Sequence, residues 1–409
     1  MNNLNKYLKN YAEAEVDLLS TFPRQKTYSH TLIIPAYKEQ ATFIDTFIRS
    51  SLVNQNVLLI IVINQPVYEK ATYVQQYLYE QAISKGQVSW QQETLTLINI
   101  TNENSSLLLV DRYTLPIEDK LGVGLARKIG ADLACYLIHH EIITTDWVHS
   151  TDADAKLPDN YFSSLIEVDS ASSVAACYNF SHKSEDKMVE RANAIYEQAL
   201  RYYVAGLTYA KSSYNYFTIG SVLAFKAEAY SSVRGFPKRS AGEDFYLLNK
   251  LAKLGNVIWL NDCLLTLEAR MSDRVPFGTG PAVKQIVELT SQGESYCYYH
   301  PVVFERLKEL LTNFNDLYIY LHELSNWYEK LPEGVQSALV SIGFETFINK
   351  QNTTQALQFS KQLIVWFDAF KTLKFIHYLR DNYYHNLPLN DAILKANFHI
   401  DLRDERISD

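Results

Sequence analysis

Two apolar runs near the start of the chain constrain its fold most strongly. They cover Thr31 to Pro35 and Val57 to Ile63, and both are apolar almost without interruption. Strands of this kind are covered on both faces, as in parallel sheets, whereas a strand with one wet face alternates apolar and polar residues. Between the runs, Phe43, Phe47 and Leu52 recur at helical spacing. The pattern predicts a βαβ unit with a right-handed crossover.

Further periodic segments extend this unit. Strands are expected at Thr94 to Ile100, just before Asp152, and at Ser221 to Phe225; helices are expected at Gly124 to His140, Ser184 to Lys211 and from about Gly242. From Pro281 onward the strand signal largely vanishes, and helices are expected at Val302 to Leu311, Leu317 to Tyr328 and Leu357 to Leu373. The chain is therefore predicted to be an α/β protein with a mostly parallel central sheet flanked by helices. Its predicted parts are an N-terminal helical extension (1–29), an α/β domain (30–280) and a helical C-terminal domain (281–409).

Composition narrows the class of protein. The chain is 47% hydrophobic and 21% charged, as a folded protein is, and its net charge of -8 argues against a nucleic-acid partner. Its four cysteines form no Cys-x-x-Cys pair, which predicts a reduced, cytoplasmic protein without a zinc knuckle. The start has no signal core, and the longest strongly apolar run is too short to span a bilayer. These observations do not decide whether the protein binds to the surface of a membrane, because a membrane-binding surface need not be contiguous in sequence.

Two acidic pairs are the candidate chemical groups. Asp152 and Asp154 follow a predicted strand, and carboxylate oxygens there suit Mg2+ or Mn2+, with open positions left for nucleotide phosphates. An isolated pair of this kind is more often a turn or a helix cap. Glu243 and Asp244 open a predicted helix, where the alternative is a simple interaction with the helix dipole. The glycines around Gly124 lack the spacing and the preceding strand of a dinucleotide fingerprint, which excludes the Rossmann interpretation.

The order of these features resembles one known family. Four features occur in sequence: Pro35 to Glu39 at the end of a strand, Lys120 to Ala134, the Asp152/Asp154 pair, and Gly242 to Asp244. Together they resemble the family 2 glycosyltransferases over roughly residues 30–280. The resemblance implies the GT-A fold, in which a nucleotide sugar binds across the carboxyl ends of the strands. Ligands of open α/β sheets also bind at that edge in general.

The resemblance implies a donor site. The residues that would line the nucleoside pocket are Pro35, Ala36, Tyr37 and Glu39, with Glu39 accepting hydrogen bonds; alternatively, Glu39 caps the next helix. Gly124 would let the nucleotide approach the backbone, and the basic side chains of Lys120 and Arg127 would neutralise the negative charge of the nucleotide. Arg127 could instead be an ordinary solvated residue at a helix start.

The resemblance also implies roles for the four acidic residues. Asp154 would bind the metal, and Asp152 would lie closer to the ribose or to metal-bound water. Asp244 would be the general base that takes a proton from the acceptor hydroxyl, with Glu243 positioning the acceptor or Asp244. The metal, Mn2+ or Mg2+, would neutralise charge on the leaving nucleoside diphosphate.

Some positions depart from the family pattern. Many members have an acidic residue after the second strand, where this chain has Asn64. The identity of the nucleobase that this chain would recognise therefore stays open. The Gln-x-x-Arg-Trp motif of processive synthases is absent, which favours transfer of a single sugar. No third metal ligand is assigned, and neither His182 nor His300 is chosen. A polar segment around Arg270, Asp273, Arg274 and Gly278 to Gly280 is suited to a lid over phosphate.

The sequence thus predicts a metal-dependent glycosyltransferase that moves one sugar from a nucleoside diphosphate sugar to an acceptor hydroxyl, with inversion if Asp244 is the base. The sugar, the acceptor and any homo-oligomer formed through the helical tail stay open. One alternative is a nucleotidyltransferase, but the first strand lacks the glycine-rich, basic triphosphate loop that it would need. Another is a catalytically silent sugar-nucleotide sensor or scaffold.

Overall fold

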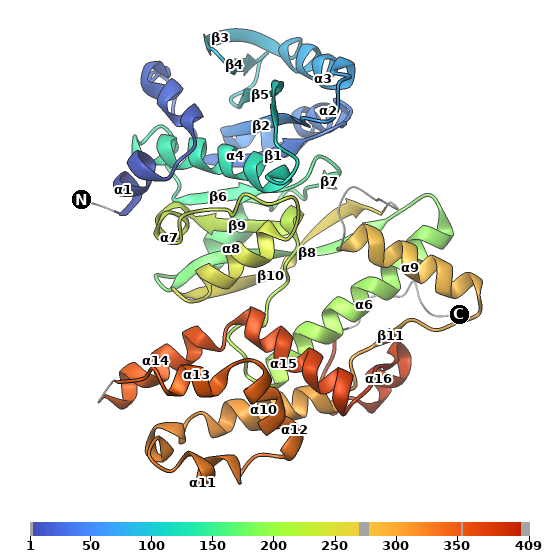
Figure 1. Ribbon diagram of the computed structural model, residues 1–409. Coiled ribbons are helices and arrows are strands. Elements are labelled where there is room, and N and C mark those ends of the chain that lie inside the picture. The colour runs from blue at the N-terminus through green and yellow to red at the C-terminus, as the bar shows by residue number, and fades with distance from the viewer. Residues whose placement is uncertain (1–2, 270–277, 353–354, 402–409) are drawn as a thin grey trace. The chain divides into compact units, whose positions relative to one another are not determined.

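The chain divides into two compact units. The computed structural model describes residues 3–269, 278–352 and 355–401 (Figure 1). The sheet unit is chiefly Met1–Lys183 and Thr218–Ala269, and the helical unit is chiefly Ser184–Phe217 and Thr279–Asp409. The chain thus enters the helical unit once with the long helix α6 (Lys187–Tyr209) and then returns to complete the sheet. The sequence boundaries at residues 29 and 280 did not anticipate this excursion.

The sheet unit is built around one large sheet. Within the described residues this sheet has ten strands, in the order β3-β4-β5-β2-β1-β6-β9-β8-β10-β7 (Figure 1). The strands are β1 (His30–Ala36), β2 (Val57–Pro66), β3 (Gly86–Gln92), β4 (Leu95–Ile100), β5 (Ser106–Ile117), β6 (Trp147–Ser150), β7 (Ala155–Lys156), β8 (Ser173–Lys183), β9 (Leu223–Lys226) and β10 (Asn256–Glu268). When the pairings are followed across the sheet, β4, β7 and β9 run against the common direction of the other seven. The predicted α/β class with a mostly parallel sheet is confirmed.

Helices cover both faces of the central strands, as the continuous apolar runs predicted. The helices of this unit are α1 (Asn3–Asn10), η1 (Ala14–Thr21), α2 (Thr42–Arg49), η2 (Ser51–Gln55), α3 (Tyr73–Ile83), α4 (Gly122–His139), α5 (Ser163–Val168), η3 (Gly220–Val222), α7 (Ala227–Ser232) and α8 (Glu243–Leu251). Side chains alternate along a strand. On β1, Leu32 and Ile34 line a pocket with Phe47 of α2, whereas Ile33 contacts α4 at Gly130. Burial on both faces explains why the strand carries no polar alternation.

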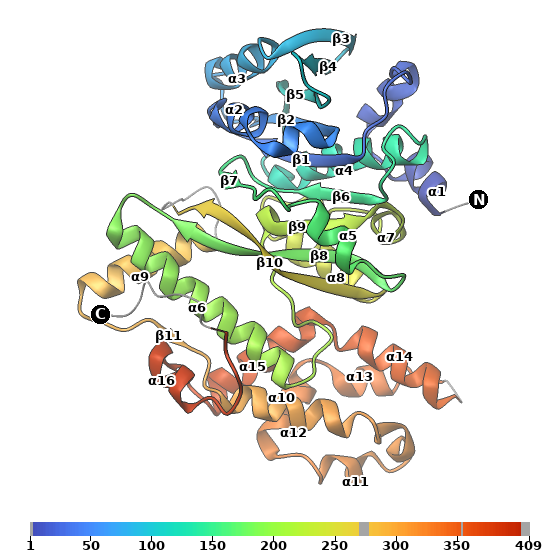
Figure 2. The same cartoon turned by 180° about the vertical axis from the view of Figure 1, so that it is seen from behind.

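The helical unit has its own aromatic-rich core. Its other elements are α9 (Thr279–Ser291), β11 (Cys297–Tyr298), α10 (Val302–Asn313), η4 (Leu317–Tyr320), α11 (Leu324–Tyr328), α12 (Glu333–Ser341), α13 (Phe344–Ile348), α14 (Ala356–Trp366), α15 (Ala369–Asn382), β12 (Leu387–Pro388) and α16 (Leu389–Lys395) (Figure 2). Phe304, Trp327 and Phe375 are fully buried in this core. The predicted helical C-terminal region is confirmed. No helix among the described residues is long and apolar enough to cross a membrane.

Two helices predicted in this unit are interrupted. The segment predicted as Leu317 to Tyr328 forms the short η4 and α11 instead of one helix. The segment predicted as Leu357 to Leu373 ends at Trp366, and Asp368 caps a new helix by accepting a hydrogen bond from the Lys371 amide at 3.1 Å. An aspartate at this position offers the backbone a local partner, which starts a helix in a new direction. The short β11–β12 ladder was also not predicted.

Candidate active site

The predicted donor residues lie at one edge of the sheet. Strands β1, β2 and β6 are parallel, with Ala36 opposite Ile63 and Ile33 opposite Ser150. The carboxyl ends of parallel strands meet at the same edge. The Tyr37 loop after β1, Asn64 near the end of β2 and the Asp152 loop after β6 therefore lie at that edge, as predicted for a ligand site of an open α/β sheet.

Arg127 is the centre of a buried network behind this edge. Its side chain is 3% exposed. The guanidinium donates from Nε to Glu243 Oε1 at 2.9 Å, from Nη1 to Ser150 Oγ at 2.8 Å and from Nη2 to Asp152 Oδ1 at 2.6 Å. A longer bond of 3.5 Å reaches the Thr151 carbonyl. Arg127 is thus not a solvated residue, and its bonds to four protein acceptors favour positioning of carboxylates over direct contact with phosphate.

Three glycines allow this network to assemble. A Cβ on Gly122, which has φ of +42°, would lie 2.5 Å from Ser240 Cα. The Gly124 amide donates to the Arg239 carbonyl at 2.9 Å, so the loop before α8 lies directly against the first turn of α4. Gly124 was expected to let a nucleotide approach, but the backbone packed against it is this protein loop. A Cβ on Gly220 would lie 2.6 Å from Arg127 Nη2.

The pKa of the Asp244 carboxyl is the most informative electrostatic property of this site. Gly242 takes φ of +73° at the start of α8, a conformation that favours glycine, and Asp244 Oδ1 accepts from the Phe245 amide at 2.7 Å. Burial raises the pKa of Asp244 to about 7, and the negative charge of Glu243 adds to this rise, while Arg127 opposes it. A carboxylate with this pKa is close to half protonated near neutrality, as a general base should be.

The Asp152/Asp154 pair suits a metal that substrate helps to bind. The side chain of Asp152 is 40% exposed although Arg127 binds one of its oxygens, and Asp154 is partly exposed. Within residues 3–269, 278–352 and 355–401, no cluster of three or more His, Cys, Asp or Glu side chains could hold a metal by itself. Mg2+ and Mn2+ commonly use one or two carboxylates, with phosphate and water completing the shell. The pair therefore fits such a cation.

The nucleoside side of the edge is partly closed. Ala36 is fully buried, so the contact predicted between Ala36 and a nucleoside is not available in this structure. Tyr37 and Glu39 are partly exposed, as is Pro35. Asn64 is 8% exposed, and its Oδ1 is buried without a hydrogen-bond partner. An unpartnered amide oxygen is costly to bury, which makes Asn64 a suitable acceptor for a ligand N–H.

Two other predicted features lie outside this network. Lys120 is 76% exposed and pairs with Glu118 at 2.8 Å, and none of the hydrogen bonds and ion pairs of the Arg127 network described above involves it. The predicted lid residues Arg270, Asp273 and Arg274 lie outside the described residues. Gly278 has φ of +108°, and Thr279 begins α9.

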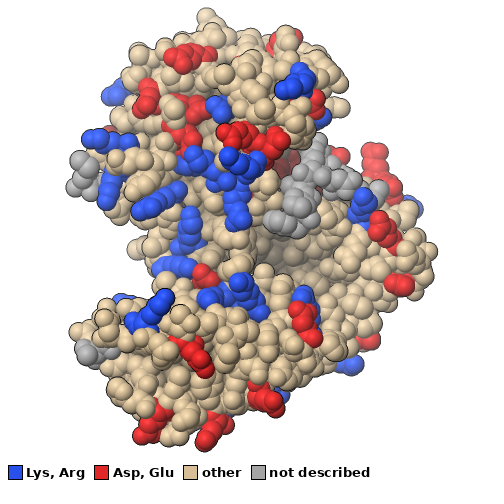
Figure 3. All heavy atoms as spheres, viewed as in Figure 1, with Lys and Arg blue, Asp and Glu red and all other residues tan. Residues whose placement is uncertain are grey.

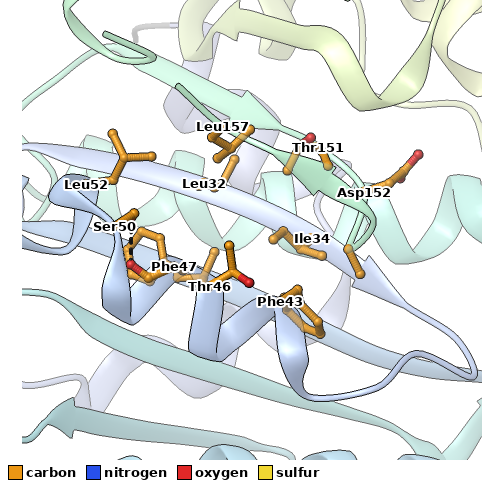
Figure 4. Close-up of a pocket in the computed structure, with 13 residues that line it drawn as sticks. Leu32, Ile34, Phe43, Thr46, Phe47, Ser50, Leu52, Thr151, Asp152 and Leu157 are labelled. Atoms are coloured by element: carbon orange, nitrogen blue, oxygen red, sulfur yellow. Dashed lines mark hydrogen bonds between the residues drawn. The ribbon is translucent and has the colours of Figure 1, made fainter. Parts of the chain in front are cut away.

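A small pocket of about 30 Å3 lies beside Asp152, between α2 and β1 (Figure 4). Its walls are mainly apolar, with Ile34, Phe43 and Phe47 among them. Such a volume holds about one water molecule, so the pocket is too small for a nucleotide.

Sequence reasoning missed a second buried network on α4. Lys128 Nζ donates to Asp132 Oδ2 at 2.8 Å, to the Tyr7 hydroxyl at 2.6 Å and to the Tyr11 carbonyl at 2.9 Å. Asp132 also accepts from the hydroxyls of Tyr7 at 2.6 Å and Tyr230 at 3.1 Å. The spacing of Lys128 and Asp132, four residues apart on a predicted helix, was the available signal.

Comparisons with known proteins give distant similarities. No family model matches the chain, and a search of the curated proteins gives no match. Among solved structures, it is similar to S. aureus TarS 1-349 in complex with UDP-GlcNAc, at 9% identity and a TM-score of 0.39, over 87% of this chain and 93% of that one. It is also similar to GalNAc-T7 with UDP, GalNAc and Mn2+, at 10% identity and a TM-score of 0.36, over 65% of this chain and 48% of that one. Both TM-scores are low, so neither similarity indicates a function for this chain.

Proposed function

We propose that the chain is an inverting, metal-dependent glycosyltransferase of the family 2 type, which transfers one sugar from a nucleoside diphosphate sugar to an acceptor hydroxyl. One observation carries the proposal: the Arg127 guanidinium joins Asp152 of one acidic pair to Glu243 of the other. Two motifs that are far apart in sequence are therefore held in one network at the carboxyl edge of the sheet. A donor phosphate at the first pair would lie close to a base at the second.

Each acidic residue has a role in the proposed reaction. Asp154 and Asp152 would hold Mn2+ or Mg2+, which when bound neutralises the charge of the leaving diphosphate. Asp244 accepts the proton of the acceptor hydroxyl while that oxygen forms a bond to the anomeric carbon. The bond between this carbon and the diphosphate oxygen breaks, and its electron pair leaves with the nucleoside diphosphate. A single displacement of this kind inverts the anomeric centre.

Arg127 and Glu243 would prepare the site rather than react. Glu243 is 5% exposed and Arg127 binds one of its oxygens, so its charge is compensated and its position fixed. Its charge helps to raise the pKa of the neighbouring Asp244. Asn64 would accept a hydrogen bond from the base through its unpartnered oxygen.

The first test is a thermal-shift and transfer panel with UDP-, GDP-, ADP- and CDP-sugars, with and without Mn2+. A ligand that binds the native state raises the melting temperature. We expect one nucleotide class to do so in a metal-dependent manner, and Asp154→Ala to abolish the effect. Asp244→Asn should keep donor binding and lose about 100- to 10,000-fold in transfer rate.

The matched control is Asp17→Asn, which removes an exposed carboxylate of η1. This variant should bind donor and transfer sugar as the wild type does. Stabilisation by no donor would overturn the transferase proposal. Binding of the donor with neither sugar transfer nor hydrolysis of the donor would instead favour the catalytically silent sensor.

A further inference from the structure

Five basic side chains of the sheet unit form a positively charged surface, here called the basic face. Lys and Arg side chains gather over the region of α7 and α8 in the view of Figure 3. The basic face consists of the exposed Arg234, Lys238 and Arg239 and the partly exposed Lys250 and Lys253. Between the first and last of these the chain has only two acidic residues, Glu243 and Asp244, and Glu243 is buried. This local excess of positive charge contrasts with the net charge of -8 of the whole chain.

Lys250 lies near two other members of the basic face, since its ammonium reaches the backbone next to Arg234 and interacts electrostatically with Arg234 and Lys253. Burial lowers the pKa of Lys250, and the positive charges of Lys128, Arg234 and Lys253 lower it further. The Lys250 ammonium donates to the Val233 carbonyl at 3.3 Å, which is a polar but uncharged partner. Like charges held within interaction range cost free energy. A partner with negative charge would remove that cost.

Three other members of the basic face have weak or shared partners. Arg234 lies over the ring of Tyr11 at 4.7 Å, and Arg239 lies over the ring of Tyr246 at 4.0 Å. Lys238 is 46% exposed and pairs at 3.1 Å with Glu13. Glu13 also lies 3.7 Å from Lys128, so one carboxylate serves two cations. The positive charges of Arg234, Lys238 and Arg239 are therefore incompletely neutralised.

We propose that the basic face binds the anionic headgroups of a lipid bilayer and makes the protein a peripheral membrane protein. Leu254 follows Lys253 directly and is 51% exposed, which supplies an apolar contact beside the cations. The aromatic rings of the face lie under arginine side chains, so they are poorly placed to stack on nucleic-acid bases. Each basic side chain near an anionic surface adds about fivefold in affinity. The proposal does not depend on sugar transfer.

The experiment is sedimentation of the full chain with vesicles of phosphatidylcholine containing about 30% phosphatidylglycerol, an anionic lipid. The wild type should sediment with these vesicles and not with pure phosphatidylcholine. The triple variant Arg234→Gln/Lys250→Gln/Lys253→Gln should lose about 100-fold in affinity. High salt should release the wild type, because screening weakens exposed charge interactions; this arm needs no variant and holds even if the triple variant folds poorly.

The control variant Arg24→Gln/Lys350→Gln/Lys361→Gln removes the same charge from exposed residues outside the basic face. It should bind anionic vesicles as the wild type does. Failure of the wild type to bind them, or an equal loss in the control, would overturn the proposal. Binding to DNA or heparin without binding to vesicles would also overturn it, and would assign the face to a soluble polyanion.

Discussion

Consecutive residues of α4, Arg127 and Lys128, organise two buried ionic networks with different designs. The Lys128 network is closed: Asp132 is 0% exposed, and both of its oxygens accept hydrogen bonds. The Arg127 network is open on one side, because Asp152 is 40% exposed and Asp244 is partly exposed. The same helix thus carries one network that fixes the N-terminal segment and one whose carboxylates are left accessible. Accessibility of charge, rather than its burial, separates the candidate active site from the scaffold.

Removing one partner of the closed network should have the largest effect on stability. Lys128→Met leaves the buried Asp132 without its cation, and the loss should be about 3–5 kcal/mol in chemical denaturation. The double variant Lys128→Met/Asp132→Leu should recover part of this loss, since no buried charge stays uncompensated. If the single variant were as stable as the wild type, the networks would not differ as described.

Breaking the open network should cost less stability and change the chemistry more. We expect Arg127→Gln to cost about 1–3 kcal/mol, because solvent can reach Asp152 when the guanidinium is lost and the glutamine amide can still donate to the buried Glu243. Arg127 lowers the pKa of Asp244, so its removal should raise that pKa further. The rising limb of the pH–rate profile should then move to higher pH. Arg24→Gln, which changes an exposed arginine, should leave the profile in place.

A smaller effect is expected on the pH dependence of stability. The folded-state pKa of Asp244 is raised from 3.8 to about 7. The stability contribution of such a group is fully present below its unfolded-state pKa of 3.8 and is lost as the pH rises through about 7. In the presence of a chelator, the melting temperature of Asp244→Asn should therefore exceed that of the wild type by a few degrees at pH 8, and the difference should shrink as the pH falls. A constant difference between pH 4 and pH 8 would contradict the raised pKa.

The sequence predicted the features that local chemistry determines. Continuous apolar runs predicted β1 and β2, and the position of Gly242 predicted the start of α8. The sequence also predicted that Asp152 would lie at the carboxyl edge of the sheet, because Asp152 directly follows a predicted strand of a parallel sheet.

The sequence did not predict which distant residues would meet. The bond between Arg127 and Glu243 depends on the path of the chain through the sheet, and no local pattern encodes it. The Tyr7–Asp132 bond likewise joins the N-terminal segment, predicted as a separate extension, to the rest of the sheet unit. Metal binding by Asp154 and the role of Asp244 as general base stay predictions, which the experiments described above test.

Gly220 has a consequence for the evolution of this chain. An alanine there would place its methyl carbon 2.6 Å from Arg127 Nη2, so the hydrogen-bonded guanidinium would have to shift from its place between the two acidic motifs. Relatives that keep the arginine should keep the glycine, and those that acquire a side chain at 220 should have a smaller residue at 127. Paired substitution at these two positions would mark the lineages in which the link between the two acidic motifs has been abandoned.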